Sequence, residues 1–211
     1  MLPIVALART GKPAFRARPG AAPAAMLIVP DAVWDGVADA ARPGWVVLVR
    51  GNRIDTLGPA ATISAPAGAE QIELPGATLV PGLIEGHSHL FLHPYDVTPW
   101  DDQVLKEPFG YRTAEAVAHA RTTLLAGITT TRDLGTEGAM DGDVQLKRAI
   151  ERGVVPGPRI LAVTRAIVAT GSYGPRRPGY AFDPPQGGDP VHDVHVLHDV
   201  RFVMKDGVRY R

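Results

Sequence analysis

Two histidines separated by one residue are the clearest candidates for chemistry in this sequence. His87 and His89 stand in the run LVPGLIEGHSHLFLHP. If this run is a strand, alternate side chains share a face, so both imidazoles point one way and Ser88 points the other. Imidazole is a good ligand for divalent transition metals, and an ion in an open site lowers the pKa of its bound water. The spacing indicates a hydrolytic metal site; the alternative is two half-exposed strand histidines.

Further polar side chains follow the histidine pair along the chain. His93 lies in the run LFLHPYD, as a substrate contact or as an ordinary loop histidine. Asp133 ends the run TTTRD, where it either takes part in a site or caps a helix and pairs with Arg132. A substrate contact or a mobile loop is expected for three residues after a third strand candidate, namely Thr170, Ser172 and Tyr173.

Other sequence patterns argue against alternative sites. His192, His195 and His198 recur every third residue, but solvated linker residues explain them better than a second metal site. Neither G-x-S-x-G nor G-x-x-x-x-G-K-[ST] occurs, so a serine nucleophile and a phosphate-binding loop are unsupported.

Composition narrows the classes of protein. The chain has 211 residues, 45% of them apolar, which is enough for a sizeable core. The formal net charge is zero, so no basic field draws in nucleic acid or anionic lipid. Cysteine is absent, which excludes disulfides and thiolate chemistry and makes the cytoplasm the default compartment. The sequence contains no run of about 18 apolar residues, so no membrane span is predicted.

Short β segments dominate residues 26–80. Glycine and asparagine at Gly51-Asn52 suit a tight hairpin turn between Trp45–Arg50 and Arg53–Leu57. Three further strands are expected in the same region, at Leu27–Val29, Gln71–Leu74 and Thr78–Val80, the last two separated by Pro75-Gly76. Residues 26–80 are therefore predicted to form a small, mostly antiparallel β module.

Residues 81–188 change to an alternation of strands and helices. Helices are expected near Thr113–Ala126 and Val144–Arg152, each followed by a glycine suited to the left-handed C-cap position. Each glycine precedes a strand candidate, at Ile128–Thr131 and Ile160–Val163. Alternating strands and helices predict an α/β fold with a parallel sheet.

The two ends of the chain differ from this central region. Residues 1–25 are rich in Pro, Ala and Arg, which predicts a disordered extension or a start codon upstream of the natural one. Ser172–Pro190 is rich in Gly and Pro, as expected for a long loop. Residues 189–211 end in a hairpin around Asp206-Gly207. This hairpin is predicted to return to residues 26–80, with Phe202 near Val47, so that one small β-sandwich domain is built from both ends.

The order of these elements, together with the run PGLIEGHSH, resembles the amidohydrolase superfamily, in its imidazolonepropionase-like and prolidase-like branch. Supporting runs are VVLVRGNRIDTLGP, LLAGITTTRDLG, VPGPRILAVTRAIVATG and DVRFVMKDGVRY. The resemblance implies a TIM-type (β/α) barrel with a composite β-sandwich domain. It also implies metal-dependent hydrolysis of a carbon–nitrogen bond in a small amide, cyclic amide or dipeptide. His87 and His89 fall on two metal ligands at the end of the first barrel strand, zinc being the first candidate.

The rest of that family's site has no counterpart here. The family pattern also expects a bridging Lys, two further His and an Asp, and Lys205 lies instead in the terminal hairpin. A (β/α)₈ barrel takes about 200–250 residues, whereas residues 81–188 suffice for about three βα units. Uncovered sheet edges favour instability or homo-oligomers. The alternative to an enzyme is therefore a truncated, non-catalytic remnant that serves as a binding or assembly module, and no catalytic residue can be assigned.

Overall fold

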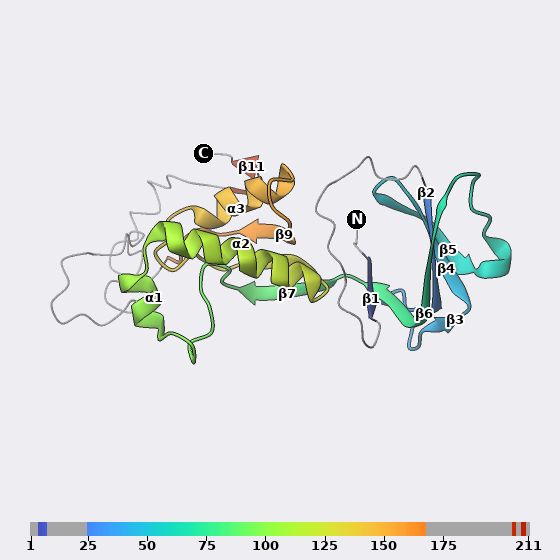
Figure 1. The fold of residues 1–211 in the computed structure, drawn as a ribbon, viewed down its shortest axis with the longest axis horizontal. Helices are drawn as coiled ribbons and strands as arrows, with labels where there is room; N and C mark the ends of the chain where they lie inside the picture. Colours follow the sequence, from blue (N-terminus) through green and yellow to red (C-terminus); the bar gives the residue numbers. More distant parts are fainter. Residues whose placement is uncertain (1–3, 8–24, 168–203, 206–207, 210–211) are drawn as a thin grey trace. The chain divides into compact units, whose positions relative to one another are not determined.

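The computed structural model describes residues 4–7, 25–167, 204–205 and 208–209 (Figure 1). The chain divides into two compact units, Met1–Leu83 and Ile84–Arg211. None of the helices in the described part of the chain combines the length and the apolar character needed to cross a bilayer.

The first unit contains a six-stranded sheet in which β1, β6, β2, β4 and β5 follow one another and β3 pairs with β2. The strands are β1 (Ile4–Leu7), β2 (Ala25–Val33), β3 (Arg42–Pro43), β4 (Trp45–Arg50), β5 (Arg53–Pro59) and β6 (Glu70–Pro81), with a 3₁₀ turn η1 at Ala60–Thr62. The predicted hairpin is confirmed, because β4 and β5 pair antiparallel around Gly51, which has a φ of 56°.

The Pro75-Gly76 step does not end a strand as expected. β6 runs unbroken through it and pairs parallel with β2, and the register shifts after Leu74↔Pro30 to Thr78↔Ala32. Pro75 has no N–H to donate, and Gly76 takes a φ of 73° that few other residues tolerate. The pair therefore forms a local irregularity within one long strand.

Ile4–Leu7 differ from the expectation of a disordered extension. These four residues form β1, which pairs antiparallel with the last part of β6, from Thr78 to Pro81. The end of β6 offers a free edge, and an apolar run of four residues suffices to pair with it. Residues 8–24, the rest of the predicted extension, lie outside the described part.

The second unit is built from alternating strands and helices. Its elements are β7 (Leu83–Ser88), α1 (Trp100–Lys106), α2 (Phe109–Leu125), β8 (Ile128–Asp133), α3 (Gly142–Glu151), β9 (Arg159–Ala162), β10 (Met204–Lys205) and β11 (Val208–Arg209). The sheet order is β7-β8-β9, with β8 parallel to β9, and the arrows of β7 and β9 point the same way in Figure 1. The predicted α/β class is therefore correct.

Both predicted helix ends carry the expected glycine. α2 is followed by Gly127 with a φ of 92°, and α3 by Gly153 with a φ of 68°. α2 begins at Phe109, four residues before its predicted start, because Pro108 with a φ of −64° sets up the first turn. α1 was not predicted. The helices and strands enclose a core made of Leu90, Phe91, Ala116, Ala120, Ala139, Leu146 and Ile160.

The terminal hairpin is present as two short strands. β10 pairs antiparallel with β11, with Lys205 opposite Val208. Its predicted return to residues 26–80 depends on Phe202, which lies outside the described residues, so the composite sandwich stays a prediction. The described strands and helices of the second unit are compatible with about three βα units of a barrel. They do not test whether a barrel closes.

Candidate metal centre

The histidine pair predicted from the sequence lies at the carboxyl end of β7. His87 is within the strand, and His89 follows its last residue, Ser88. The two rings lie with their centroids 5.3 Å apart and their planes at 65°. Ser88, between them, hydrogen bonds to Thr131 of the neighbouring strand β8. The alternation expected of a strand therefore brings the two imidazoles together.

A backbone carbonyl fixes the orientation of the His89 ring. Nδ1 of His89 lies 2.9 Å from the carbonyl oxygen of Gly135, in the loop after β8. A carbonyl only accepts, so Nδ1 carries the proton and donates it. In the neutral ring, Nε2 then has the lone pair. Metal-ligating histidines are commonly oriented in this way by their second nitrogen.

Asp133 connects the loop after β7 to the loop after β8 through hydrogen bonds. It is fully buried, and its carboxylate accepts the backbone N–H of Leu90 at 3.1 Å and of Gly135 at 3.1 Å. Burial raises the pKa of Asp133 to about 6, while these two donors act in the opposite direction. The expected alternative, an ion pair with Arg132, is replaced by these backbone contacts. Asp133 thus links the residue after His89 to the residue that holds the His89 ring.

An open cavity of about 300 Å³ borders the end of β7. His89 and Ser88 line it from the strand side, and His119 and Thr122 line it from α2. Nδ1 of His119 contacts the carbonyl oxygen of Leu90 at 2.9 Å. A small molecule in this cavity would therefore lie against His89.

His93 has partners that the sequence did not indicate. Its Nε2 lies 3.1 Å from Oε1 of Glu107 and 3.7 Å from Oε2 of Glu115. Glu107 precedes α2 and Glu115 lies within it, 14 and 22 residues after His93. No short motif joins three such residues.

The remaining sequence candidates lie outside the described residues. These are Thr170, Ser172 and Tyr173, and also His192, His195 and His198.

A model of the amidohydrolase family matches residues 78–207, which is more than half of the chain. The match contains the β7 histidine pair and the βα elements around it. The chain therefore belongs to the amidohydrolase family, whose members include hydrolases of carbon–nitrogen bonds.

Two solved structures share both sequence and fold with this chain. One is a Xaa-Pro dipeptidase with bound methionine in the active site, with 28% identity and a TM-score of 0.64 over 76% of this chain and 39% of its own. Another is a prolidase complexed with N-methylphosphonate-L-proline, with 27% identity and a TM-score of 0.63 over 76% of this chain and 37% of its own.

Molinate hydrolase, at 21% identity and a TM-score of 0.54, shares the fold. This chain spans less than two fifths of the length of the Xaa-Pro dipeptidase and of the prolidase. No curated protein matches it.

Proposed function

We propose that this chain takes part in metal-dependent hydrolysis of a carbon–nitrogen bond, with His87 and His89 as two ligands of a divalent ion. The observation that carries the proposal is the His89 ring, whose Nδ1 contacts the Gly135 carbonyl so that Nε2 keeps its lone pair beside His87. Zinc is the first candidate, because imidazole nitrogen is among its preferred ligands.

The donor set fits such an ion in part. Two imidazoles with ring centroids 5.3 Å apart supply two nitrogen ligands. Catalytic zinc sites use three protein ligands and leave one position open. A third ligand would therefore come from residues beyond those described, or from another chain.

The residues present support the chemistry in defined ways. A bound divalent ion would polarise a substrate carbonyl and lower the pKa of a water molecule towards neutrality. His89 is oriented for the ion by Gly135, and the two loops stay together through Asp133. The cavity beside His89 would hold the substrate near the histidine pair. His93 has been expected to contact substrate; its buried ion pairs favour a different role, developed below.

Dipeptides are the substrate class that we propose to test before other amides. The support is similarity to a Xaa-Pro dipeptidase and to a prolidase at 27–28% identity. Homo-oligomers remain part of the proposal, because a three-stranded parallel sheet leaves edges that a second chain could cover.

A non-catalytic binding or assembly module is the second candidate. It is favoured by a described site with two histidine ligands instead of three.

Metal content and turnover separate the two candidates. We expect the His87→Ala/His89→Ala variant to lose one equivalent of zinc relative to the wild type after equilibrium dialysis. His119→Gln is the matched control, because its ring contacts the Leu90 carbonyl and lies outside the proposed pair. Equal zinc content in all three proteins would reject the metal site. If zinc is lost as expected but no dipeptide or cyclic amide is hydrolysed by the zinc, manganese or cobalt forms, the non-catalytic candidate is correct.

A further inference from the structure

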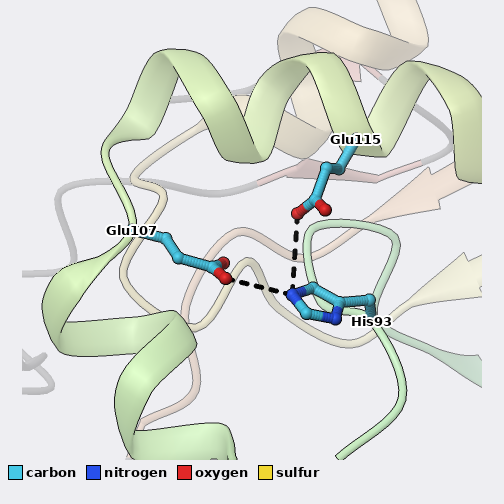
Figure 2. Close-up of side chains that lie close together, drawn as sticks. All are labelled: His93, Glu107 and Glu115. Atoms are coloured by element: carbon cyan, nitrogen blue, oxygen red, sulfur yellow. Dashed lines mark hydrogen bonds and ion pairs between the residues drawn. The ribbon is translucent and has the colours of Figure 1, made fainter. Parts of the chain in front are cut away.

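A second group of metal-ligating side chains lies in the same unit, formed by His93, Glu107 and Glu115. Figure 2 shows both carboxylates directed at Nε2 of His93. His93 comes from the loop after β7, Glu107 from the junction of α1 and α2, and Glu115 from α2. One ligand atom from each of the three lies within 4.8 Å of the other two. Three separate segments of the chain therefore converge on one point.

The cluster is largely withdrawn from solvent. The side chain of His93 is 9% exposed, and those of Glu107 and Glu115 are 17% and 22% exposed. Oε2 of Glu107 and Oε2 of Glu115 are buried atoms without a hydrogen-bond donor in the structure's described part. Buried carboxylate oxygens normally accept hydrogen bonds or bind a cation, because leaving them without a partner costs free energy.

A cationic side chain, Arg112, lies close to the cluster. The carboxylates of Glu107, Glu115 and Glu137 all lie close enough to Arg112 to raise its pKa, against burial, which lowers it more strongly. The Arg112 guanidinium is already bonded to the backbone carbonyls of Phe91, Thr136 and Glu137. Its charge is therefore shared among several carboxylates, and a divalent cation would add to it at the cluster.

The surroundings hold the cluster in place. Gln103, which is fully buried, accepts the N–H of His93 at 2.9 Å and donates to its carbonyl oxygen at 2.9 Å. Outer hydrogen bonds of this kind fix metal ligands before the ion arrives.

We propose that His93, Glu107 and Glu115 form a site for a divalent transition metal, zinc being the best match, separate from the His87 and His89 pair. One imidazole nitrogen and two carboxylate oxygens are a donor set that zinc accepts. Two ligand atoms about 2.1 Å from one ion lie about 3.0–3.4 Å apart. The 3.1 Å separation of His93 from Glu107 fits directly, and the 3.7 Å separation from Glu115 needs a shift of a few tenths of an ångström.

The ion has a structural role in this arrangement. It joins the loop after β7 to the start of α2. Phe91 of this loop and Ala116 of α2 belong to the same core cluster. Because this loop begins at the histidine pair, the site secures the segment that carries His89. The inference does not depend on the proposed hydrolysis.

Zinc binding in a background without the first histidine pair tests the proposal. We expect His87→Ala/His89→Ala protein to lose one further equivalent of zinc when Glu107→Gln/Glu115→Gln is added. Glutamine keeps the size of each side chain and removes its charge. Glu151→Gln, at an exposed position of α3, is the matched control and should leave zinc content unchanged. Histidines outside the described residues contribute equally to all of these proteins, so the difference is specific.

A second measurement does not require the glutamate variant to fold. In the His87→Ala/His89→Ala protein with ¹⁵N-labelled histidine, zinc should shift the Nε2 resonance of His93, identified by its absence from the His93→Gln spectrum. An unshifted His93 resonance at saturating zinc would overturn the proposal, as would an unchanged zinc content in the glutamine variant. In that case the contacts are ion pairs of a protonated His93. If zinc shifts the His93 resonance but the His87 and His89 pair binds no zinc, the proposed function is rejected and the site at His93 is supported.

Discussion

The imidazole of His89 donates from Nδ1 to the carbonyl oxygen of Gly135 at 2.9 Å, across the ends of two neighbouring strands. Gly135 has a φ of 134°, and a Cβ placed there would lie 3.5 Å from the carbonyl oxygen of Thr164. Space therefore allows a side chain, but the backbone conformation disfavours one. The orientation of a proposed metal ligand thus depends on a glycine 46 residues later in the sequence.

Gly135→Ala should weaken zinc binding at the His87 and His89 pair by about tenfold, because the carbonyl that orients His89 moves. It should also reduce the free energy of unfolding by about 1–3 kcal/mol through backbone strain. Isothermal titration with zinc and chemical denaturation measure the two effects. Gly153→Ala is the control: its φ of 68° brings similar strain, but it lies at the end of α3. Equal zinc affinity in both variants would contradict the predicted link.

Asp133 should make the protein less stable as pH rises through the weakly acidic range. Its folded pKa of about 6 exceeds the ordinary value of 3.8, so the folded state binds more protons between these values. The free energy of unfolding should therefore fall by about 2 kcal/mol from pH 3.8 to pH 6. Denaturation of metal-free wild type and Asp133→Asn across this range isolates the contribution as their difference.

Asp35→Asn gives a control of opposite sign for that measurement. Asp35 accepts the backbone N–H groups of Ala38 and Val37, which lower its pKa. Its contribution to stability is present above pH 3.8 and is lost as pH falls. A difference curve for Asp133 that slopes the same way as the curve for Asp35 would show that Asp133 does not carry the raised pKa.

Arg112→Met should cost about 3–5 kcal/mol in the free energy of unfolding. The buried guanidinium bonds to three backbone carbonyl oxygens and lies near three carboxylates, and methionine replaces none of these interactions. Arg112→Lys should recover part of the loss, since it keeps the charge without the planar fork. Arg148→Met, on the exposed side of α3, should change stability by about 0.5 kcal/mol or less. Urea denaturation compares the three, and a loss of similar size at Arg148 would contradict the assignment.

Gly142→Ala should destabilise the second unit by about 1–3 kcal/mol through overpacking. A Cβ at Gly142 would lie 2.6 Å from two ring atoms of Phe91, which is 1% exposed and has little room to move. Gly110→Ala in α2 is the counterpart: its Cβ meets no atom within 4 Å, and alanine favours the helix by up to about 1 kcal/mol. Thermal denaturation should give opposite signs, and a neutral Gly142→Ala would contradict the packing.

Local pattern alone was sufficient for much of the second unit. The helices α2 and α3 were predicted together with the glycines that follow them, and strands alternating with helices predicted the parallel sheet, because these features depend on residues a few positions apart. The same reason explains the histidine pair: a spacing of two places both rings on one side of β7. The hairpin around Gly51 followed equally from its turn residues.

Other features depended on contacts between residues far apart in the chain. Pro75-Gly76 signalled a break, yet pairing with β2 carried β6 through it. Asp133 could have paired with its neighbour Arg132, but the fold buried it against Leu90, 43 residues earlier. The cluster around His93 formed because the end of β7 and the start of α2 pack together, bringing Glu107 and Glu115 to it. Sequence spacing determines which side chains share a face of one element; only the packing of elements decides which faces meet.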